Sequence, residues 1–366
     1  MSIVTVMKLA FIFRLALGLS GLSLPACALS HDIHVPPARY RIPDEPVVIG
    51  EGRFKYELVP GWAQHNTAAY PIGNGKAIVE DAKGRIYHLN GSRKHCVIVL
   101  DKKGEVLDAW GDFAPGAHGL NLVREEGREA LFISENRADG KIFKTTLGGK
   151  ILMTVGCPME SGLYPDPKRF RPAEIVPIPG DGGFFVLDGY GSDYILRFDA
   201  SGNYLSAFGG NLGEGEAALA HWGPHGGNID TRNPKQPILL LGLSDQEKVK
   251  RFRLDGTWID TIPMPGANPR DLVFHRGHVF IPHLGDDWPK SRNNPGYISV
   301  VDYDFKVVAN LGGATAVYRD GRLQRMRHNQ HAFYHPHGIL CASDGSLYVV
   351  QDASNNTWPL KFRPLD

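Results

Sequence analysis

The amino-acid sequence predicts an all-β protein, built as a six-bladed β-propeller with four-stranded blades. Short apolar runs alternate with glycine-containing turns such as DAKG at 81–84 and DASG at 199–202, which is the pattern of β-hairpins. These runs recur in units of about forty residues, the length of a propeller blade. Complete units close on an aromatic or valine followed by glycine, as at 110–111 and 155–156.

Six units align along the chain. Their bounds are 76–111, 118–156, 173–210, 225–263, 270–313, and a last unit that begins at 337 and stops early. Each complete unit supplies four strands, from an inner strand to an outer one. The sixth unit lacks its outer strand, and RFKYELVPGW at 53–62 is expected to supply it and close the ring, because open strand edges promote aggregation. Another blade count or a pair of β-sandwiches is the alternative.

The N-terminus is expected to be a targeting segment rather than part of the ring. Residues 1–28 combine Lys8, an apolar stretch and the small-residue sequence ACA at 26–28, which fits a cleaved signal peptide. In the alternative reading Cys27 is a lipidated residue, and only then is membrane attachment expected. Residues 29–50 are rich in proline and are interpreted as a linker or arm, with the propeller spanning 51–366. The expected location is therefore the periplasm or the exterior.

The charge balance limits the classes of partner. Lys and Arg number 40 against 39 Asp and Glu, for a net charge of +1. This balance lacks the basic footprint of a nucleic-acid-binding protein, so no nucleic acid is expected. A small-molecule or peptide-like substrate and a monomeric state are expected instead.

Three histidines occupy the same position in alternate units. Counting back from the first apolar residue of each inner strand gives Lys76, His118, Ala173, His225, Arg270 and His337. Inner strands line the axis, and units two, four and six lie a third of a turn apart, so the three imidazoles are expected to converge. A lone histidine here would more often be a structural hydrogen-bonding residue. The shared register favours a metal site, and three neutral histidines with an open fourth position are typical of catalytic zinc.

The residues around this register extend the prediction. Each of the three histidines precedes a glycine, which leaves room for a neighbouring backbone to pass close by. Lys76 and Arg270 on intervening units are expected to make the mouth of the channel cationic and to bind an anionic group of the substrate. Zn²⁺ is the expected ion, with iron, copper or manganese as alternatives.

The stretch DGYGSDYILRFDASGNYLSAFGG at 188–210 resembles the repeats of NHL-type six-bladed propellers, a resemblance that covers about residues 50–366. Within that group the chain resembles peptidyl-α-hydroxyglycine α-amidating lyases. The resemblance implies zinc ligands at His118, His225 and His337. It also implies a catalytic base at Tyr190, in the DGY motif, and an arginine at Arg93, in NGSRKHCVIV, that pairs with the substrate carboxylate. The implied reaction breaks a C–N bond of an α-hydroxy substrate, leaving an amide and a glyoxylate-like carbonyl.

Two positions depart from that family. Gln246 stands where the family has a second arginine, and a glutamine cannot act as a charged bidentate fork; it is kept here as a substrate-contacting residue. Gly338 follows the third histidine where the family has a calcium-binding aspartate, so no structural Ca²⁺ is predicted.

Two other functions stay open. A non-catalytic propeller that binds a protein or ligand would not need the three histidines. A lactonase-type hydrolase would bind calcium through Glu, Asn and Asp near the axis, and only Glu174 is well placed for that. The sequence therefore favours a metal-dependent lyase over both.

Overall fold

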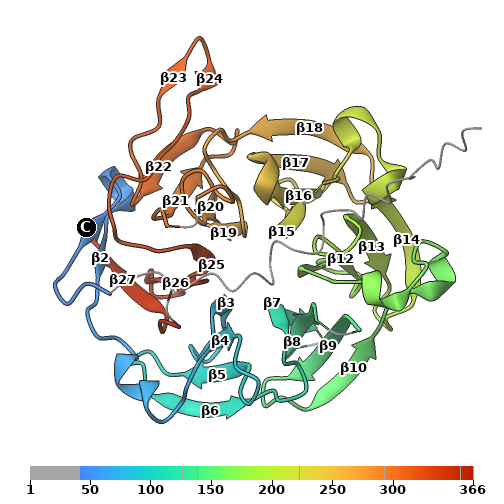
Figure 1. Cartoon of the computed structure of the whole chain (residues 1–366), viewed down its shortest axis with the longest axis horizontal. Coiled ribbons are helices and arrows are strands. Elements are labelled where there is room, and N and C mark those ends of the chain that lie inside the picture. Colours follow the sequence, from blue (N-terminus) through green and yellow to red (C-terminus); the bar gives the residue numbers. More distant parts are fainter. Residues whose placement is uncertain are drawn as a thin grey trace, which may run out of the picture. The chain divides into compact units, whose positions relative to one another are not determined.

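The computed structural model describes residues 42–365, except 126, 138, 222, 292 and 355. The predicted signal peptide, Cys27 and the first part of the predicted arm lie outside the described residues. Six antiparallel sheets are arranged as a ring around a central axis (Figure 1). The predicted all-β, six-bladed propeller with four-stranded blades is confirmed.

The first five blades are four-stranded, and the inner strand comes first in the chain. Blade one contains β3 (Gly75–Glu80), β4 (Ile86–Asn90), β5 (Val97–Leu100) and β6 (Val106–Trp110). Blade two contains β7 (Ala117–Glu125), β8 (Arg128–Glu135), β9 (Lys141–Thr146) and β10 (Ile151–Val155). Blade three contains β11 (Glu174–Pro177), β12 (Phe184–Leu187), β13 (Tyr194–Phe198) and β14 (Tyr204–Gly209). Blade four contains β15 (Pro224–Asp230), β16 (Ile238–Leu243), β17 (Lys248–Arg253) and β18 (Trp258–Pro263).

Blade five has the shortest inner strand. It contains β19 (Val273–His275), β20 (His278–His283), β21 (Tyr297–Val301) and β22 (Val307–Leu311). The sequence predicted an inner strand from residue 270. Although β19 begins later, the Arg270 amide still donates to the Pro282 carbonyl at 3.0 Å. Position 270 therefore keeps its place beside the second strand of the blade.

The sixth blade is closed by the N-terminal part of the described chain. Its order is β25 (Pro336–Cys341), β26 (Leu347–Gln351), β27 (Leu360–Pro364), β2 (Tyr56–Leu58) and β1 (Val48–Ile49). Strand β2 pairs antiparallel with β27, with Leu58 opposite Phe362. The prediction that 53–62 supplies the missing strand is confirmed, and β1 adds a fifth strand from the segment interpreted as an arm.

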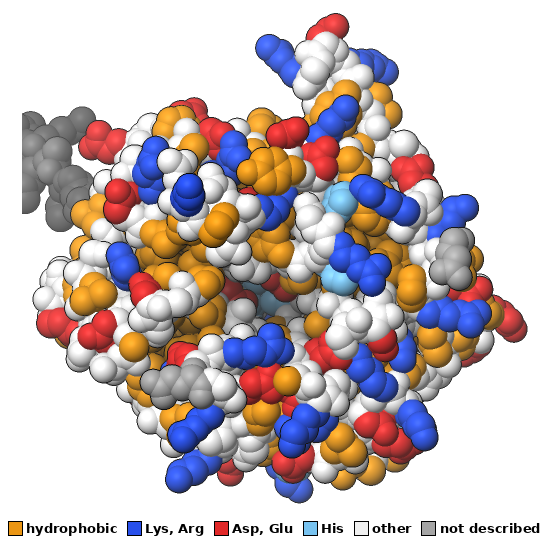
Figure 2. All heavy atoms as spheres, turned by 180° about the vertical axis from the view of Figure 1, so that it is seen from behind, with side chains coloured by type: hydrophobic (Ala, Val, Ile, Leu, Met, Phe, Trp, Pro, Cys, Tyr) orange, Lys and Arg blue, Asp and Glu red, His pale blue; other side chains and the backbone are white. Residues whose placement is uncertain are grey.

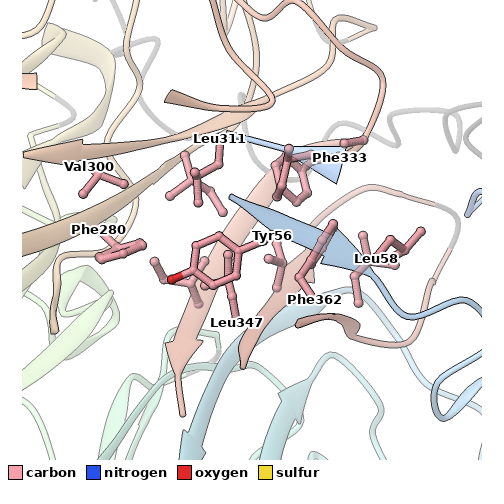
Figure 3. Close-up of a cluster of buried hydrophobic side chains, with 14 of the residues drawn as sticks. Tyr56, Leu58, Phe280, Val300, Leu311, Phe333, Leu347 and Phe362 are labelled. Carbon is pink, nitrogen blue, oxygen red and sulfur yellow. The ribbon is translucent and has the colours of Figure 1, made fainter. Parts of the chain in front are cut away.

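The hydrophobic core is divided among the interfaces between neighbouring blades. Alternate residues of a strand point to opposite faces of its sheet, so each blade packs apolar side chains against both neighbours. A separate buried cluster fills each interface around the ring. Figure 3 shows the interface of blades five and six, where Tyr56 and Leu58 of the closing strand pack near Phe280 and Phe362. The closing strand thus joins the core rather than only covering an edge.

Many hairpin connections are tight turns, whereas longer connections span 156–173, 210–223, 284–296 and 312–335. The helical segments are 3-10 helices: η2 (Gly52–Phe54), η3 (Gln64–Thr67), η4 (Met159–Ser161), η5 (Pro167–Arg169), η6 (Gly210–Leu212), η7 (Gly215–Ala217) and η8 (Ser244–Gln246). Residues 314–334 contain the hairpin β23 (Tyr318–Arg319) and β24 (Arg322–Leu323), which extends from the rim of the ring in Figure 1. Within the described ranges, no helix has the length and apolar character needed to cross a membrane.

Leu58→Ala should destabilise the ring. Leu58 is 2% exposed in the closing interface, and loss of a buried leucine side chain typically costs about 2–5 kcal/mol. Urea unfolding followed by circular dichroism measures the change. Leu107→Ala is the matched control, because Leu107 is 53% exposed on an outer strand and its loss should cost little. Equal stability of the two variants would contradict a core role for the closing strand.

Candidate metal centre

The structure brings the three histidines of the shared register together. One ring nitrogen of each lies within 4.8 Å of the others, and all three residues are buried. Each pair of rings has a centroid separation of 4.9 Å, so the group is close to threefold symmetric. The residues come from β7, β15 and β25, the inner strands of blades two, four and six. Figure 2 shows a hollow near the centre of one face of the ring, with histidine side chains in and beside it.

Backbone carbonyls of the intervening blades orient the three rings. The Nδ1 atoms donate to carbonyl oxygens at 2.8, 2.9 and 2.7 Å, in the pairs His118–Ala173, His225–Arg270 and His337–Lys76. A carbonyl only accepts, so each Nδ1 carries the proton, and each neutral ring keeps a lone pair on Nε2. The three acceptors hold the equivalent position of blades three, five and one. Blades without a histidine therefore also build the site.

The glycine after each histidine makes room for these carbonyls. A Cβ atom at Gly226 would lie 2.2 Å from the Arg270 oxygen, one at Gly338 would lie 2.7 Å from the Lys76 oxygen, and one at Gly119 would lie 2.8 Å from the Ala173 oxygen. Such distances are too short for carbon and oxygen. The His-Gly pair is thus a packing requirement, because the oxygen that orients the ring passes over the next residue.

The electrostatic state of the histidines suits a cation. Burial lowers the pKa of His118 and His225 well below the usual value. Burial likewise lowers the pKa of His337 to about 3, with the Lys76 charge acting in the same direction. The imidazoles are therefore neutral near pH 7, and their Nε2 lone pairs face one another. A buried group of three histidines in this state can hold a metal ion.

Tyr190 reaches the same point from blade three. Its hydroxyl lies 2.9 Å from Nε2 of His118 and 3.0 Å from Nε2 of His225. Both nitrogens are acceptors, so the single phenolic proton serves one of them at a time. Burial raises the pKa of Tyr190 well above its usual value, and the Arg270 charge opposes this rise.

A buried aspartate shapes the loop that carries Tyr190. The Asp188 carboxylate accepts from the Arg171 amide at 2.6 Å, the Ser192 amide at 2.9 Å and the Tyr164 hydroxyl at 2.8 Å. These bonds wind residues 188–193 around one side chain. The loop is thereby fixed in the conformation that directs Tyr190 toward the histidines.

The other predicted residues differ in their surroundings. Lys76 donates to Asp352 at 3.0 Å and is mostly buried. Arg270 is 4% exposed. Gln246 uses its amide nitrogen to hold the Leu219 carbonyl at 2.9 Å. Arg93 is exposed in the loop between β4 and β5, and no hydrogen bond or ion pair in the described part of the chain joins it to the histidines; its catalytic role stays a prediction.

Two residues near the site were missed by the sequence interpretation. Trp288 lies with its ring centroid 5.7 Å from the Arg270 guanidinium carbon and 5.1 Å from the His335 ring. Asp245 lies 4.0 Å from the same guanidinium. Both follow the second strand of their blades, the position that Tyr190 holds in blade three. That shared position is the signal that would have identified them.

A separate groove of about 1140 Å³ lies between blades two and three. Arg124, Glu125, Lys144 and Asp181 are among its lining residues. Arg124 and Glu125 lie at the end of β7 and Asp181 follows the end of β11, whereas the histidines lie near the starts of their strands. The groove is thus distinct from the histidine site.

Comparison with known proteins supports the fold. No protein-family model matches the chain, and no curated protein matches it. A streptogramin B lyase structure is 15% identical, covering 81% of this chain and 95% of that one with a TM-score of 0.53. A catalytically inactive variant of virginiamycin B lyase from Staphylococcus aureus with quinupristin is 12% identical, covering 87% and 100% with a TM-score of 0.51. A protein of unknown function from Bacteroides thetaiotaomicron is 10% identical, covering 87% and 76% with a TM-score of 0.51. At such identities the likeness establishes the fold alone.

His118→Ala should abolish metal binding without unfolding the ring, because the blade interfaces have cores of their own. Elemental analysis of the purified protein should give about one metal per chain for the unaltered protein and a large loss in the variant. His65→Ala is the control, since His65 is 51% exposed and pairs with Glu105. Metal retained by the His118 variant, or global unfolding seen by circular dichroism, would contradict this reading of the site.

Gly226→Ala should weaken metal binding about 10- to 100-fold, as changes behind a metal ligand commonly do. The new Cβ would displace the Arg270 carbonyl that orients His225. Competition with a chromophoric chelator measures the affinity. Gly148→Ala serves as the control, because a Cβ there meets nothing within 4 Å. An unchanged affinity would show that the carbonyl does not matter for the ligand.

Proposed function

We propose that the chain is a zinc-dependent lyase that cleaves the C–N bond of an α-hydroxy substrate, in the manner of the amidating lyases it resembles. One observation carries the proposal: three Nε2 lone pairs converge within 4.8 Å, and the Tyr190 hydroxyl lies 2.9 and 3.0 Å from two of them. The site thus combines a ligand set for a cation with a group able to carry a proton. Two structures of the same fold are named as lyases, so the fold is compatible with this chemistry.

The donor set favours zinc over harder cations. Three neutral imidazoles suit zinc, whereas magnesium and calcium prefer oxygen ligands. Zinc held by His118, His225 and His337 would supply a positive charge that favours loss of a proton from a nearby hydroxyl group and stabilises the Tyr190 phenolate against the effect of burial.

Tyr190 is proposed to carry the proton. As the phenolate, its oxygen accepts the proton of the substrate hydroxyl, the C–N electron pair leaves with the nitrogen, and a C=O bond forms at the hydroxyl carbon. The proton then passes to the nitrogen, giving an amide and a carbonyl product. No co-reactant is needed, since the hydroxyl proton is the one that the nitrogen receives. The Asp188-centred loop keeps the phenol in place for both transfers.

The biological setting is part of the proposal. The substrate is taken to be small or peptide-like, and the enzyme is taken to be exported and monomeric. The charge balance and the N-terminal signal pattern support these assignments. Arg93 and Gln246 stay predicted substrate contacts.

A second candidate is a non-catalytic binding propeller. The groove of about 1140 Å³ between blades two and three favours it, since its charged and apolar lining suits a protein or ligand surface. A lactonase-type calcium site is less well supported. Glu174 accepts from Asn121 at 2.7 Å and burial raises its pKa to about 8, so it is a poor ligand for calcium.

Tyr190→Phe should keep the metal and lower the rate at least about 100-fold, the usual effect of losing a proton-transfer group. The assay is release of glyoxylate from an N-acyl-α-hydroxyglycine by the zinc-loaded enzyme. Tyr303→Phe is the control, because Tyr303 is 59% exposed. Full activity of the Tyr190 variant would remove that residue from the mechanism. Inactivity of the unaltered, zinc-loaded protein on several such substrates would reject the reaction type.

A further inference from the structure

We propose that Arg270, on blade five, binds a carboxylate of the ligand beside the three histidines. The proposal rests on the metal-dependent function above and specifies which group of the substrate is recognised and by which residue. Four residues were predicted to contact the substrate besides Tyr190. Their surroundings in the structure separate them clearly.

The guanidinium of Arg270 is buried but poorly satisfied. Its Nε donates to Asn268 at 3.3 Å, a long contact for a charged donor. Its Nη2 has no hydrogen-bond partner in the described part of the chain, and the nearest carboxylate, Asp245, lies 4.0 Å away. An arginine offers five N–H donors, and leaving them unused in a buried site is unfavourable. An arriving planar anion would satisfy them.

The position of Arg270 directs that anion to the reacting atoms. Its own carbonyl orients His225 at 2.9 Å, so backbone and side chain belong to one site. Its guanidinium lies 4.0 Å from Asp245, which is on the loop after the second strand of blade four. That loop corresponds to the one that carries Tyr190 in blade three. A ligand whose hydroxyl lies at the histidines would thus place a neighbouring carboxylate within reach of Arg270.

The surroundings hold Arg270 in place. The Arg270 guanidinium carbon lies over the Trp288 ring, 5.7 Å from its centroid, which is within the range of a cation–π contact. Asn268 is itself held by the Ser244 carbonyl at 2.9 Å, and the Ser244 hydroxyl donates to the Pro269 carbonyl at 2.6 Å. These bonds tie the residues before Arg270 to the neighbouring blade. The side chain is therefore preorganised for a bidentate contact.

The other predicted contacts are either paired with other groups or exposed to solvent. Lys76 is paired with Asp352 at 3.0 Å. Although burial acts in the opposite direction, the Lys76 charge holds the pKa of Asp352 well below its usual range, so this pair is neutral overall. The Gln246 side-chain amide donates hydrogen bonds to backbone carbonyls, and Arg93 is exposed. Arg270 is left as the cation available to an anion.

The test compares two ligands that differ only in charge. Glycolate and glycolamide share the hydroxyl, and the amide replaces the carboxylate. Isothermal titration calorimetry is run on the metal-free protein and on the zinc-loaded protein. Unaltered protein should prefer glycolate, and Arg270→Gln should weaken glycolate binding about tenfold or more, as expected for a lost charge-assisted bond, while glycolamide binding changes little. Arg270→Lys should give an intermediate value, because it keeps the charge without the fork.

Arg253→Gln, an exposed arginine of β17, is the control and should bind both ligands like the unaltered protein. Circular dichroism verifies that each variant is folded, and if Arg270→Gln does not fold, Arg270→Lys decides the result. An equal loss for both ligands, no loss for glycolate, or no preference for glycolate in the unaltered protein would overturn the assignment of Arg270. If the protein does not bind zinc but the metal-free protein still shows an Arg270-dependent preference for glycolate, the proposed function is rejected. The assignment of Arg270 as the carboxylate-binding residue is then retained.

Discussion

The site depends on three hydrogen bonds from histidine Nδ1 atoms to backbone carbonyls. These bonds, at 2.7 to 2.9 Å, decide which ring nitrogen carries the proton and where the other one points. Without them each ring could rotate or take the other tautomer, and the three lone pairs would not meet. Because every acceptor belongs to the next blade, the geometry of the site is set by how neighbouring blades pack. Ring closure is consequently a requirement of the site as well as of stability.

That dependence explains the alternation of residues around the axis. A histidine in one blade needs a backbone carbonyl from the next blade. Any residue type can supply that carbonyl, so the residue type at the intervening position is free to vary. Ala173, Arg270 and Lys76 occupy the three intervening positions, and only the last two carry charge. The threefold arrangement of the ligands is thus combined with an asymmetric set of neighbours. A symmetric metal site can in this way recognise an asymmetric ligand.

Sequence reasoning predicted the fold because its signals are periodic. Turn residues, strand lengths and the recurrence of the unit all depend on backbone physics, and they located the blades, the closing strand and the common register of the histidines. The loops after the second strands were harder to predict from the sequence, because the directions of their side chains depend on individual hydrogen bonds and ion pairs. The contacts of Gln246 with Leu219 and of Lys76 with Asp352 join segments far apart in the chain. Nothing local marks them, and Trp288 lies in a long loop without periodicity.

The charges around the histidines bear on what can bind there. The histidines are neutral, Lys76 pairs with Asp352, and Arg270 has Asp245 as a more distant partner at 4.0 Å. A divalent ion would therefore add positive charge to a buried site whose other charges are already balanced, and an excess of one sign is costly in a medium of low polarity. An anionic ligand relieves that cost, whereas a neutral ligand leaves it and a cationic one increases it. Selection for anions thus follows from the balance of charges at the axis, although the whole chain is almost neutral.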